Sequence, residues 1–187
     1  MEKISFKEKS PRIKSLNEVI SEIIDRINHK SVLIIDIDGV LINIDIKVFL
    51  RGLILYMFSK KQFRNFLKEY KIPTSFLLKI KRIRKKGADV ILLTSRFQTK
   101  DKSYFPFISQ ETIERFQKSD IFIIPYPKFS FGIVELPEKI INKIKNKSEI
   151  FYIGSGKLDE LIFKKLAGQF KDKKFEYFQV GQGNRLI

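Results

Sequence analysis

Four short, largely apolar runs recur along the chain, and each is followed by small or polar residues. They cover residues 32–35, 88–93, 121–124 and 150–153, and a weaker run follows at 175–180. Runs of this length that are rich in Ile, Leu and Val and bounded by turn residues are typical of strands buried on both faces of a sheet. The pattern therefore predicts four buried strands and a fifth strand that closes the chain.

The segments between these runs carry helical periodicity instead. Ser15 and Glu18 form an S-x-x-E capping box, and apolar residues then recur on one helix face as far as Ile27. Another helix is expected to begin at Thr74 or Ser75 and to end at Gly87, which suits a C-cap. Further helices are expected in residues 43–72, as two short helices with a break near residue 59, and in residues 110–118, 137–146 and 159–167.

Alternation of strands and helices determines the expected fold class. Parallel strands need crossover connections, and a helix in each crossover covers a face of the sheet. We therefore expect an α/β, Rossmann-like three-layer sandwich with a mostly parallel sheet, formed by residues 1–187 as one domain. Residues 1–14 show little periodicity and are expected to form a loose or docked arm.

Composition narrows the chemistry. The chain has no cysteine, which excludes disulfides, thiolate catalysis and cysteine-based zinc sites. His29 is the single histidine, so no site that needs two imidazoles is available. We see no secretory signal, and the longest apolar stretch, residues 48–58, is interrupted by Arg51 and too short for a membrane span. We therefore expect a soluble, cytoplasmic protein without a transmembrane segment.

The charge balance points to anionic partners without identifying one. Lys and Arg number 37 against 21 Asp and Glu, which gives a net charge of +16. Residues 60–86 hold many of these cations, interleaved with aromatic residues, and Glu69 is the one acid among them. Such a window is typical of contact with a nucleic-acid backbone, but also of a solvated helix face. Segment 48–58 is open to three interpretations: packing over a site, a dimer contact or contact with a membrane surface.

Polar side chains that can carry chemistry follow three of the predicted strands. Because the carboxyl ends of parallel strands meet at one edge of a sheet, we expect these side chains to converge on an active site. The hydroxyl and guanidinium groups after the second strand suit phosphate oxygens. The residues concerned are Asp36, Asp38, Thr94, Ser95, Arg96, Ser155 and Asp159.

Three of these segments resemble the motifs of the haloacid dehalogenase-like (HAD) superfamily, whose members are mostly phosphatases. Residues 34–41, Ile-Ile-Asp-Ile-Asp-Gly-Val-Leu, look like its first motif, in which D-x-D-G-T/V-L follows a hydrophobic strand. Residues 91–94 look like the second motif, a hydrophobic strand closed by Thr or Ser. Residues 152–159 resemble the acidic fourth motif, G-D-x-x-x-D.

The resemblance extends to the neighbouring segments. Residues 159–163, Asp-Glu-Leu-Ile-Phe, are locally similar to the D-E-x-x-F tail of the fourth motif in trehalose-phosphate phosphatases. Those enzymes insert a large cap after the second motif, whereas the insertion in this chain lies between the first and second motifs. Small helical caps occur there in the superfamily, so residues 43–73 are expected to form one.

The resemblance implies a phosphatase that works through an aspartyl-phosphate intermediate. Asp36 would attack phosphorus, and Asp38 would protonate the leaving oxygen and then activate water. Thr94 would donate to a phosphoryl oxygen. A lysine would neutralise the developing charge, and the sequence leaves Lys128 and Lys139 as candidates. Further candidates for binding the phosphate are Gly39, Ser95 and Arg96.

Magnesium is the cofactor that the resemblance implies. In the superfamily the ion is held by the nucleophile, by the backbone carbonyl of the second aspartate and by an acid of the fourth motif. Those positions are Asp36, Asp38 and Asp159, with Ser155 where the first acid of the fourth motif stands in the family. A hydroxyl is a poorer ligand than a carboxylate. Either Asp159 carries the metal, directly or through water, or the chain is a degenerate member of the superfamily.

Two functions therefore remain open. The first is a magnesium-dependent phosphatase that acts on a phosphorylated small molecule or on a nucleic-acid end. The alternative is a HAD-fold protein without catalysis that binds nucleic acid or another polyanion through residues 60–86. A homodimer is compatible with both.

Overall fold

A single parallel sheet organises the protein. The computed structural model describes residues 14–41, 46–69, 74–94, 97–98, 104–105, 114, 116, 121–125 and 138–181. The sheet has five strands in the order β5-β2-β1-β6-β7, and every neighbouring pair is parallel. The strands are β1 (Ser31–Asp36), β2 (Asp89–Thr94), β5 (Ile121–Pro125), β6 (Glu149–Gly154) and β7 (Lys174–Gln179).

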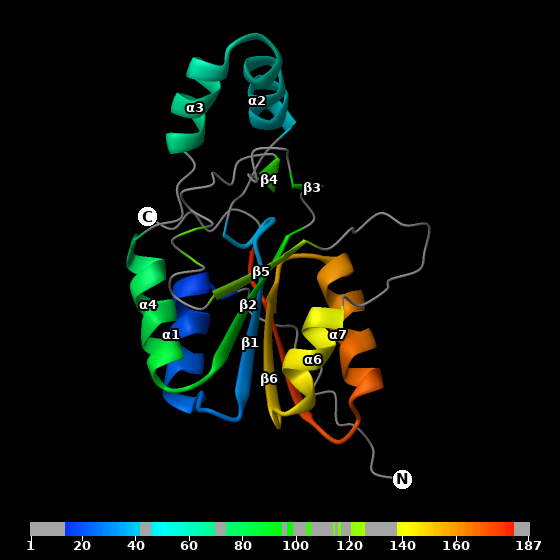
Figure 1. Ribbon diagram of the computed structural model, residues 1–187. Coiled ribbons are helices and arrows are strands. Elements are labelled where there is room, and N and C mark those ends of the chain that lie inside the picture. Colours follow the sequence, from blue (N-terminus) through cyan, green and yellow to red (C-terminus); the bar gives the residue numbers. More distant parts are fainter. Residues whose placement is uncertain are drawn as a thin grey trace.

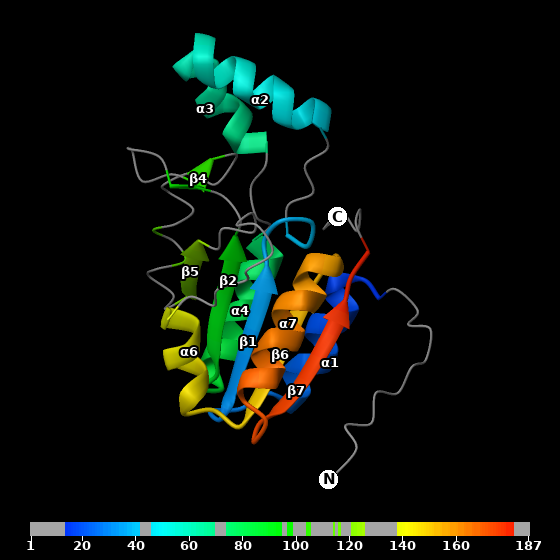
Figure 2. The ribbon, with the colours of Figure 1, turned by 90° about the vertical axis from the view of Figure 1, so that its right-hand side faces the viewer.

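The first strand lies in the middle of the sheet. From β1 the chain builds β2 and β5 on one side and then returns to place β6 and β7 on the other side (Figure 2). Ligands of open α/β sheets bind outside the carboxyl ends of the strands where the strand order reverses. The topology therefore puts the carboxyl end of β1, between β2 and β6, at the position where this fold class builds its sites.

Helices cover both faces of the sheet (Figure 1). Helices α1 (Leu16–Arg26) and α4 (Thr74–Lys85) lie on one face, and α6 (Glu138–Lys145) and α7 (Lys157–Gln169) lie on the other. This arrangement confirms the predicted α/β class and is compatible with a Rossmann-like sandwich.

Burial on both faces explains the apolar pattern of β1. Leu33 and Ile35 belong to the core under α1 and α4, whereas Val32 and Ile34 belong to the core under α6 and α7. All six residues of β1 are buried. An alternating pattern would have left one face in water, so the continuous run is what this central strand requires.

The predicted helices that fall within the described residues agree with the structure in type, and α7 differs at its start. The Ser15–Glu18 capping box is present at α1, and Gly87 has a φ of +82° just after α4. Helix α7 begins at Lys157 rather than at residue 159, because Gly156 serves as its N-cap and Asp159 stands at the third helical position. The predicted helix at residues 110–118 lies mostly outside the described residues, as does the arm at residues 1–14.

A two-stranded antiparallel pair occurs where the sequence predicted only a loop. Strands β3 (Phe97–Gln98) and β4 (Tyr104–Phe105) pair with each other and stand apart from the main sheet. Two residues in each strand are too few to produce a period-2 pattern, which is why the sequence did not reveal them.

The insertion after β1 holds two helices that lie beyond the carboxyl edge of the sheet (Figures 1 and 2). They are α2 (Ile46–Phe58) and α3 (Lys60–Glu69), and the break between them falls at Ser59 as predicted. The Ser59 hydroxyl accepts a 3.4 Å hydrogen bond from the Gln62 amide at the start of α3. The role of residues 43–73 as a cap stays a prediction.

Candidate functional site

The carboxyl end of β1 carries the two aspartates. Asp36 is the last residue of β1 and is completely buried, and Asp38 follows just past the strand with partial exposure. The intervening Ile37 amide donates a 2.8 Å hydrogen bond to the Leu93 carbonyl of β2. Gly39 then turns the chain with a φ of +91°, a conformation that favours glycine. The backbone that holds both carboxylates is therefore fixed by a strand bond on one side and a turn on the other.

Strand β2 supplies the first partner of this loop. The hydroxyl of Thr94, the buried last residue of β2, donates a 3.1 Å hydrogen bond to Oδ2 of Asp38. The parallel register sets Asp36 opposite Leu93, so the residues that follow the two strands come out side by side. The predicted convergence of Asp38 and Thr94 is confirmed.

Strand β6 supplies the second partner from the other side of β1. The Ser155 hydroxyl donates a 3.3 Å hydrogen bond to the backbone carbonyl of Asp38. A Cβ atom at Gly39 would lie 2.4 Å from the Ser155 Oγ, so a larger residue in this turn would force the serine to move. The loop after β1 is thus held between the ends of β2 and β6.

Asp159 is buried behind Ser155 and anchors the start of α7. Its Oδ2 accepts hydrogen bonds from the amides of Ser155, at 2.9 Å, and Gly156, at 3.2 Å. Without Asp159 these amides would lack an acceptor at the start of the helix, where the helix dipole also favours a negative charge. Only 2% of Asp159 is exposed, so the carboxylate needs these donors. In this position Asp159 fixes the backbone that carries Ser155.

Two tyrosines behind Asp159 were not predicted as part of the site. The Tyr152 hydroxyl lies 3.5 Å from the Asp159 Oδ1, at the long limit of a hydrogen bond, and the Tyr152 and Tyr177 rings lie 5.8 Å apart. Burial, followed by the negative charges of Asp159 and Asp36, raises the pKa of Tyr152 well above its ordinary value. Tyr152 carries the one hydroxyl in an otherwise apolar run. That hydroxyl could have indicated a buried polar neighbour, but it was not used in the prediction.

The Tyr177 hydroxyl is buried without a hydrogen-bond partner among the described residues. It lies close to Gly154, where a Cβ atom would meet the Tyr177 hydroxyl at 2.9 Å and the Asp159 Cβ at 2.4 Å. Burial and the charge of Asp159 raise the pKa of Tyr177, so both tyrosines stay neutral beside the buried carboxylate. The residues that surround the Asp159 side chain are therefore tightly packed as well as polar.

The sequence proposed four residues as magnesium ligands. Three of them, Asp38, Ser155 and Asp159, are linked by hydrogen bonds in the structure. No group of three or more Asp, Glu, His or Cys side chains suited to a metal occurs in the described part of the chain. The Asp159 carboxylate already accepts two amide protons, and Ser155 contributes a hydroxyl instead of a charge. The Asp36 carboxylate and the Asp38 carbonyl, which accepts the Ser155 hydroxyl, are the other oxygens of the predicted set, and their role as ligands stays a prediction. Magnesium accepts such a small set because it keeps several waters and also binds substrate phosphate.

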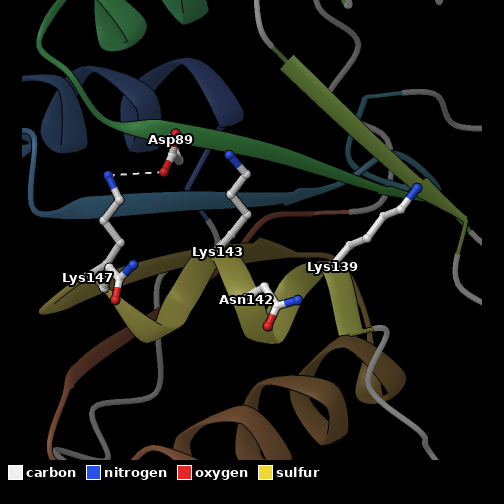
Figure 3. Close-up of a pocket in the computed structure, with 6 residues that line it drawn as sticks. Asp89, Lys139, Asn142, Lys143 and Lys147 are labelled. Atoms are coloured by element: carbon white, nitrogen blue, oxygen red, sulfur yellow. Dashed lines mark ion pairs between the residues drawn. The ribbon is translucent and has the colours of Figure 1, made fainter.

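Lys139 is the described member of the two candidate lysines. It lies in the first turn of α6, the helix that follows β5 along the chain, and its side chain is exposed. It lines a pocket of about 500 Å³ with residues of α6 and Asp89. Figure 3 shows Lys147 at one end of this pocket and Lys139 at the other. Lys128, Ser95 and Arg96 lie outside the described residues, so the choice between the two lysines stays open.

An ion-pair cluster occupies the Lys147 end of the pocket. Asp89, the first residue of β2, lies 3.0 Å from the Lys147 Nζ and 2.9 Å from the Arg84 guanidinium (Figure 3 draws the Lys147 pair). Burial alone would raise the pKa of Asp89, but the hydrogen bonds and charges of Lys147, Lys143 and Arg84 outweigh it and lower the pKa. This end of the pocket is therefore a structural cluster in which three cations surround one carboxylate, remote from the aspartates after β1.

The fold and these contacts together define an α/β protein with a polar cluster at the carboxyl edge of a parallel sheet. No protein-family model matches the chain, and no curated protein is significantly similar to it. The function must therefore be argued from the cluster itself.

Proposed function

We propose that the protein is a phosphatase of the HAD type that hydrolyses a phosphomonoester through an aspartyl-phosphate intermediate on Asp36. The observation that supports this proposal best is the meeting of three strand ends. Asp38 is bonded by Thr94 of β2 through its carboxylate and by Ser155 after β6 through its backbone carbonyl. These are the segments whose sequences resemble the three motifs of the superfamily.

In the first step of the proposed reaction, a carboxylate oxygen of Asp36 attacks phosphorus and the bond from phosphorus to the leaving oxygen breaks. Asp38 gives its proton to that leaving oxygen. In the second step Asp38 takes a proton from water, whose oxygen attacks phosphorus and releases Asp36. Thr94 is a positioning residue for Asp38 in the resting site, and its hydroxyl would turn to a phosphoryl oxygen when substrate binds.

The proposed cofactor is Mg²⁺, which would supply positive charge against the phosphate and the Asp36 carboxylate. Asp36 and the Asp38 carbonyl would hold it, with water and substrate oxygens completing the coordination. Asp159 would act through water, because its Oδ2 is engaged by the Ser155 and Gly156 amides. A lysine, Lys139 or Lys128, would complete the charge balance.

Hydrolysis of an aryl phosphate by the full chain tests the proposal. We expect phosphate release that depends on added Mg²⁺ and disappears when the metal is chelated. Absence of turnover with Mg²⁺, Mn²⁺, Co²⁺ and Ni²⁺ alike would contradict the proposed function.

Replacing Ser155 with aspartate is expected to strengthen Mg²⁺ binding to the free protein by about 10-fold or more. The new carboxylate would add a charged oxygen beside the Asp38 carbonyl, which the Ser155 hydroxyl now contacts at 3.3 Å. Isothermal titration with Mg²⁺ alone measures the effect. Ser155→Asn is the matched control, because it adds similar bulk without charge and should leave the affinity near that of the parent. Equal affinity in Ser155→Asp and the parent would place the metal elsewhere.

Polyanion binding is a second candidate, and the exposure of the basic face of α4 favours it. Lys81, Arg82 and Lys85 are exposed, whereas Lys86 donates a hydrogen bond to the Ile24 carbonyl of α1. If this face binds nucleic acid, oligonucleotide affinity should fall steeply with salt and survive Asp36→Asn. Neutralising Lys81, Arg82 and Lys85 to Gln should weaken it and reduce the salt slope. Unchanged affinity in that triple variant would identify this face as merely solvated.

A further inference from the structure

Helix α2 exposes a stripe of large apolar side chains. Leu50, Ile54, Met57 and Phe58 are 48%, 56%, 66% and 79% exposed. Their spacing of i, i+4, i+7 and i+8 places them on one face of the helix. We call these four residues the α2 stripe. Large side chains exposed together on one face are typical of an interaction surface.

The other side of α2 is already used by α3. Phe66 of α3 is buried under the Arg51 guanidinium, which lies 5.4 Å from the ring centroid, and the Tyr56 and Phe63 rings meet edge to face at 5.2 Å. Gly52 is buried as well. The two helices therefore form a hairpin with its own small core, and the α2 stripe faces away from that core.

Positive charge accompanies the stripe. Lys47 and Arg51 are exposed on the same helix; Lys47 lies about one turn before Leu50, and Arg51 directly follows it. The sequence of residues 46–69 holds six Lys and Arg, and its one acid is Glu69 at the end of α3. An apolar face flanked by cations and free of acids complements a surface that has an apolar interior and negative head groups.

The hairpin is also accessible to a flat surface. Figures 1 and 2 show α2 and α3 at one extremity of the molecule, beyond the carboxyl edge of the sheet, and Figure 2 shows α2 as the outermost element. No described helix is long and apolar enough to cross a membrane, so a membrane contact made by α2 would lie in the interface.

We propose that the α2 stripe docks the protein onto the surface of an anionic lipid bilayer. The stripe would enter the boundary between head groups and acyl chains, and Lys47 would keep its charge at the level of the phosphates. Association with a second copy fits the charges less well. A two-fold contact would set the cations of the hairpin against their own copies, and residues 46–68 offer no acid to pair with them.

Co-sedimentation of the full chain with lipid vesicles tests this proposal. We expect binding to phosphatidylcholine vesicles that contain about one third phosphatidylglycerol, weaker binding as salt rises, and little binding to pure phosphatidylcholine. Replacing Ile54, Met57 and Phe58 with Ser should weaken binding by at least about 10-fold, because each buried apolar side chain contributes substantially. The matched control is Leu78→Ser together with Leu161→Ser, which removes two leucines of 57% and 56% exposure outside the hairpin.

Several results would overturn the proposal. One is equal vesicle binding by the triple serine variant and the parent, when circular dichroism shows that both proteins are folded. Another is loss of vesicle binding in the Leu78→Ser, Leu161→Ser control. A dimer in sedimentation velocity that the triple variant converts to a monomer, without vesicle binding by the parent, would assign the stripe to a second copy instead.

Discussion

Asp36→Asn is expected to lower kcat for an aryl phosphate by at least about 10³-fold, the range typical for removal of a nucleophile. The amide cannot form the acyl phosphate, and it also removes the one carboxylate that the proposed metal would contact directly. The backbone should keep its geometry, because the Ile37 amide remains bonded to the Leu93 carbonyl whatever the side chain at position 36. Steady-state phosphate release under saturating substrate measures the change.

Stability must be measured in the same variant. Asp36 is completely buried, so the unfolding temperature of Asp36→Asn must show that the variant is folded before its activity is interpreted. Asp172→Asn is the matched control, because Asp172 is exposed in the turn before β7 and should keep full activity. Activity of a folded Asp36→Asn protein within about 10-fold of the parent would show that phosphorus is not attacked from this position.

Asp159→Ala is expected to lower the free energy of unfolding by about 3 kcal/mol. The carboxylate satisfies the Ser155 and Gly156 amides at the start of α7, and its Oδ1 faces the Tyr152 hydroxyl. Alanine would leave these donors unsatisfied in a site where only 2% of residue 159 is exposed. Chemical denaturation followed by circular dichroism gives the difference.

Asp159→Asn separates hydrogen bonding from charge. Its side-chain oxygen can still accept from the Ser155 amide, so we expect a loss of only about 1 kcal/mol. A loss below about 0.5 kcal/mol in Asp159→Ala would contradict the anchoring role, because surface substitutions have effects of that size. If Asp159→Asn is folded and also binds Mg²⁺ as tightly as the parent, the charge of Asp159 plays no part in holding the metal.

The sequence was sufficient for the sheet and for the place of the cluster. The run at residues 32–35 identified a strand buried on both faces, because a central strand needs apolar residues on its two sides. Local signals such as the Ser15–Glu18 box and Gly87 were also reliable, since each depends on neighbours within one turn of the chain. The meeting of Asp38 with Thr94 and Ser155 followed from the parallel arrangement of the strands.

The finer contacts could not be predicted from the sequence. Which oxygen of Asp38 each neighbour bonds depends on the register between strands that are distant along the chain. The sequence did not reveal that Asp159 accepts the Ser155 and Gly156 amides, because it placed the start of α7 about two residues too late. The role of Asp159 toward a metal stays a prediction. Tyr177 was missed because its strand lies at the edge of the sheet and shows only a weak apolar pattern.

Helix α2 shows a different limit of sequence reasoning. Its residues are apolar almost all round, so periodicity cannot tell which face is covered. The structure separates the face that meets Phe63 and Phe66 from the exposed face of Ile54 and Phe58. The three interpretations of this segment could be weighed only after that separation.

Chemical trapping of the intermediate tests the central claim most directly. The full chain would be mixed with an aryl phosphate and Mg²⁺, quenched in acid, and treated with borohydride, which reduces an acyl phosphate to an alcohol. Peptide mass spectrometry would then locate the reduced residue. We expect reduction at position 36, and none at position 38 or in Asp36→Asn. Phosphate release without reduction at position 36, or with reduction at another acid, would contradict Asp36 as the residue that accepts the phosphoryl group.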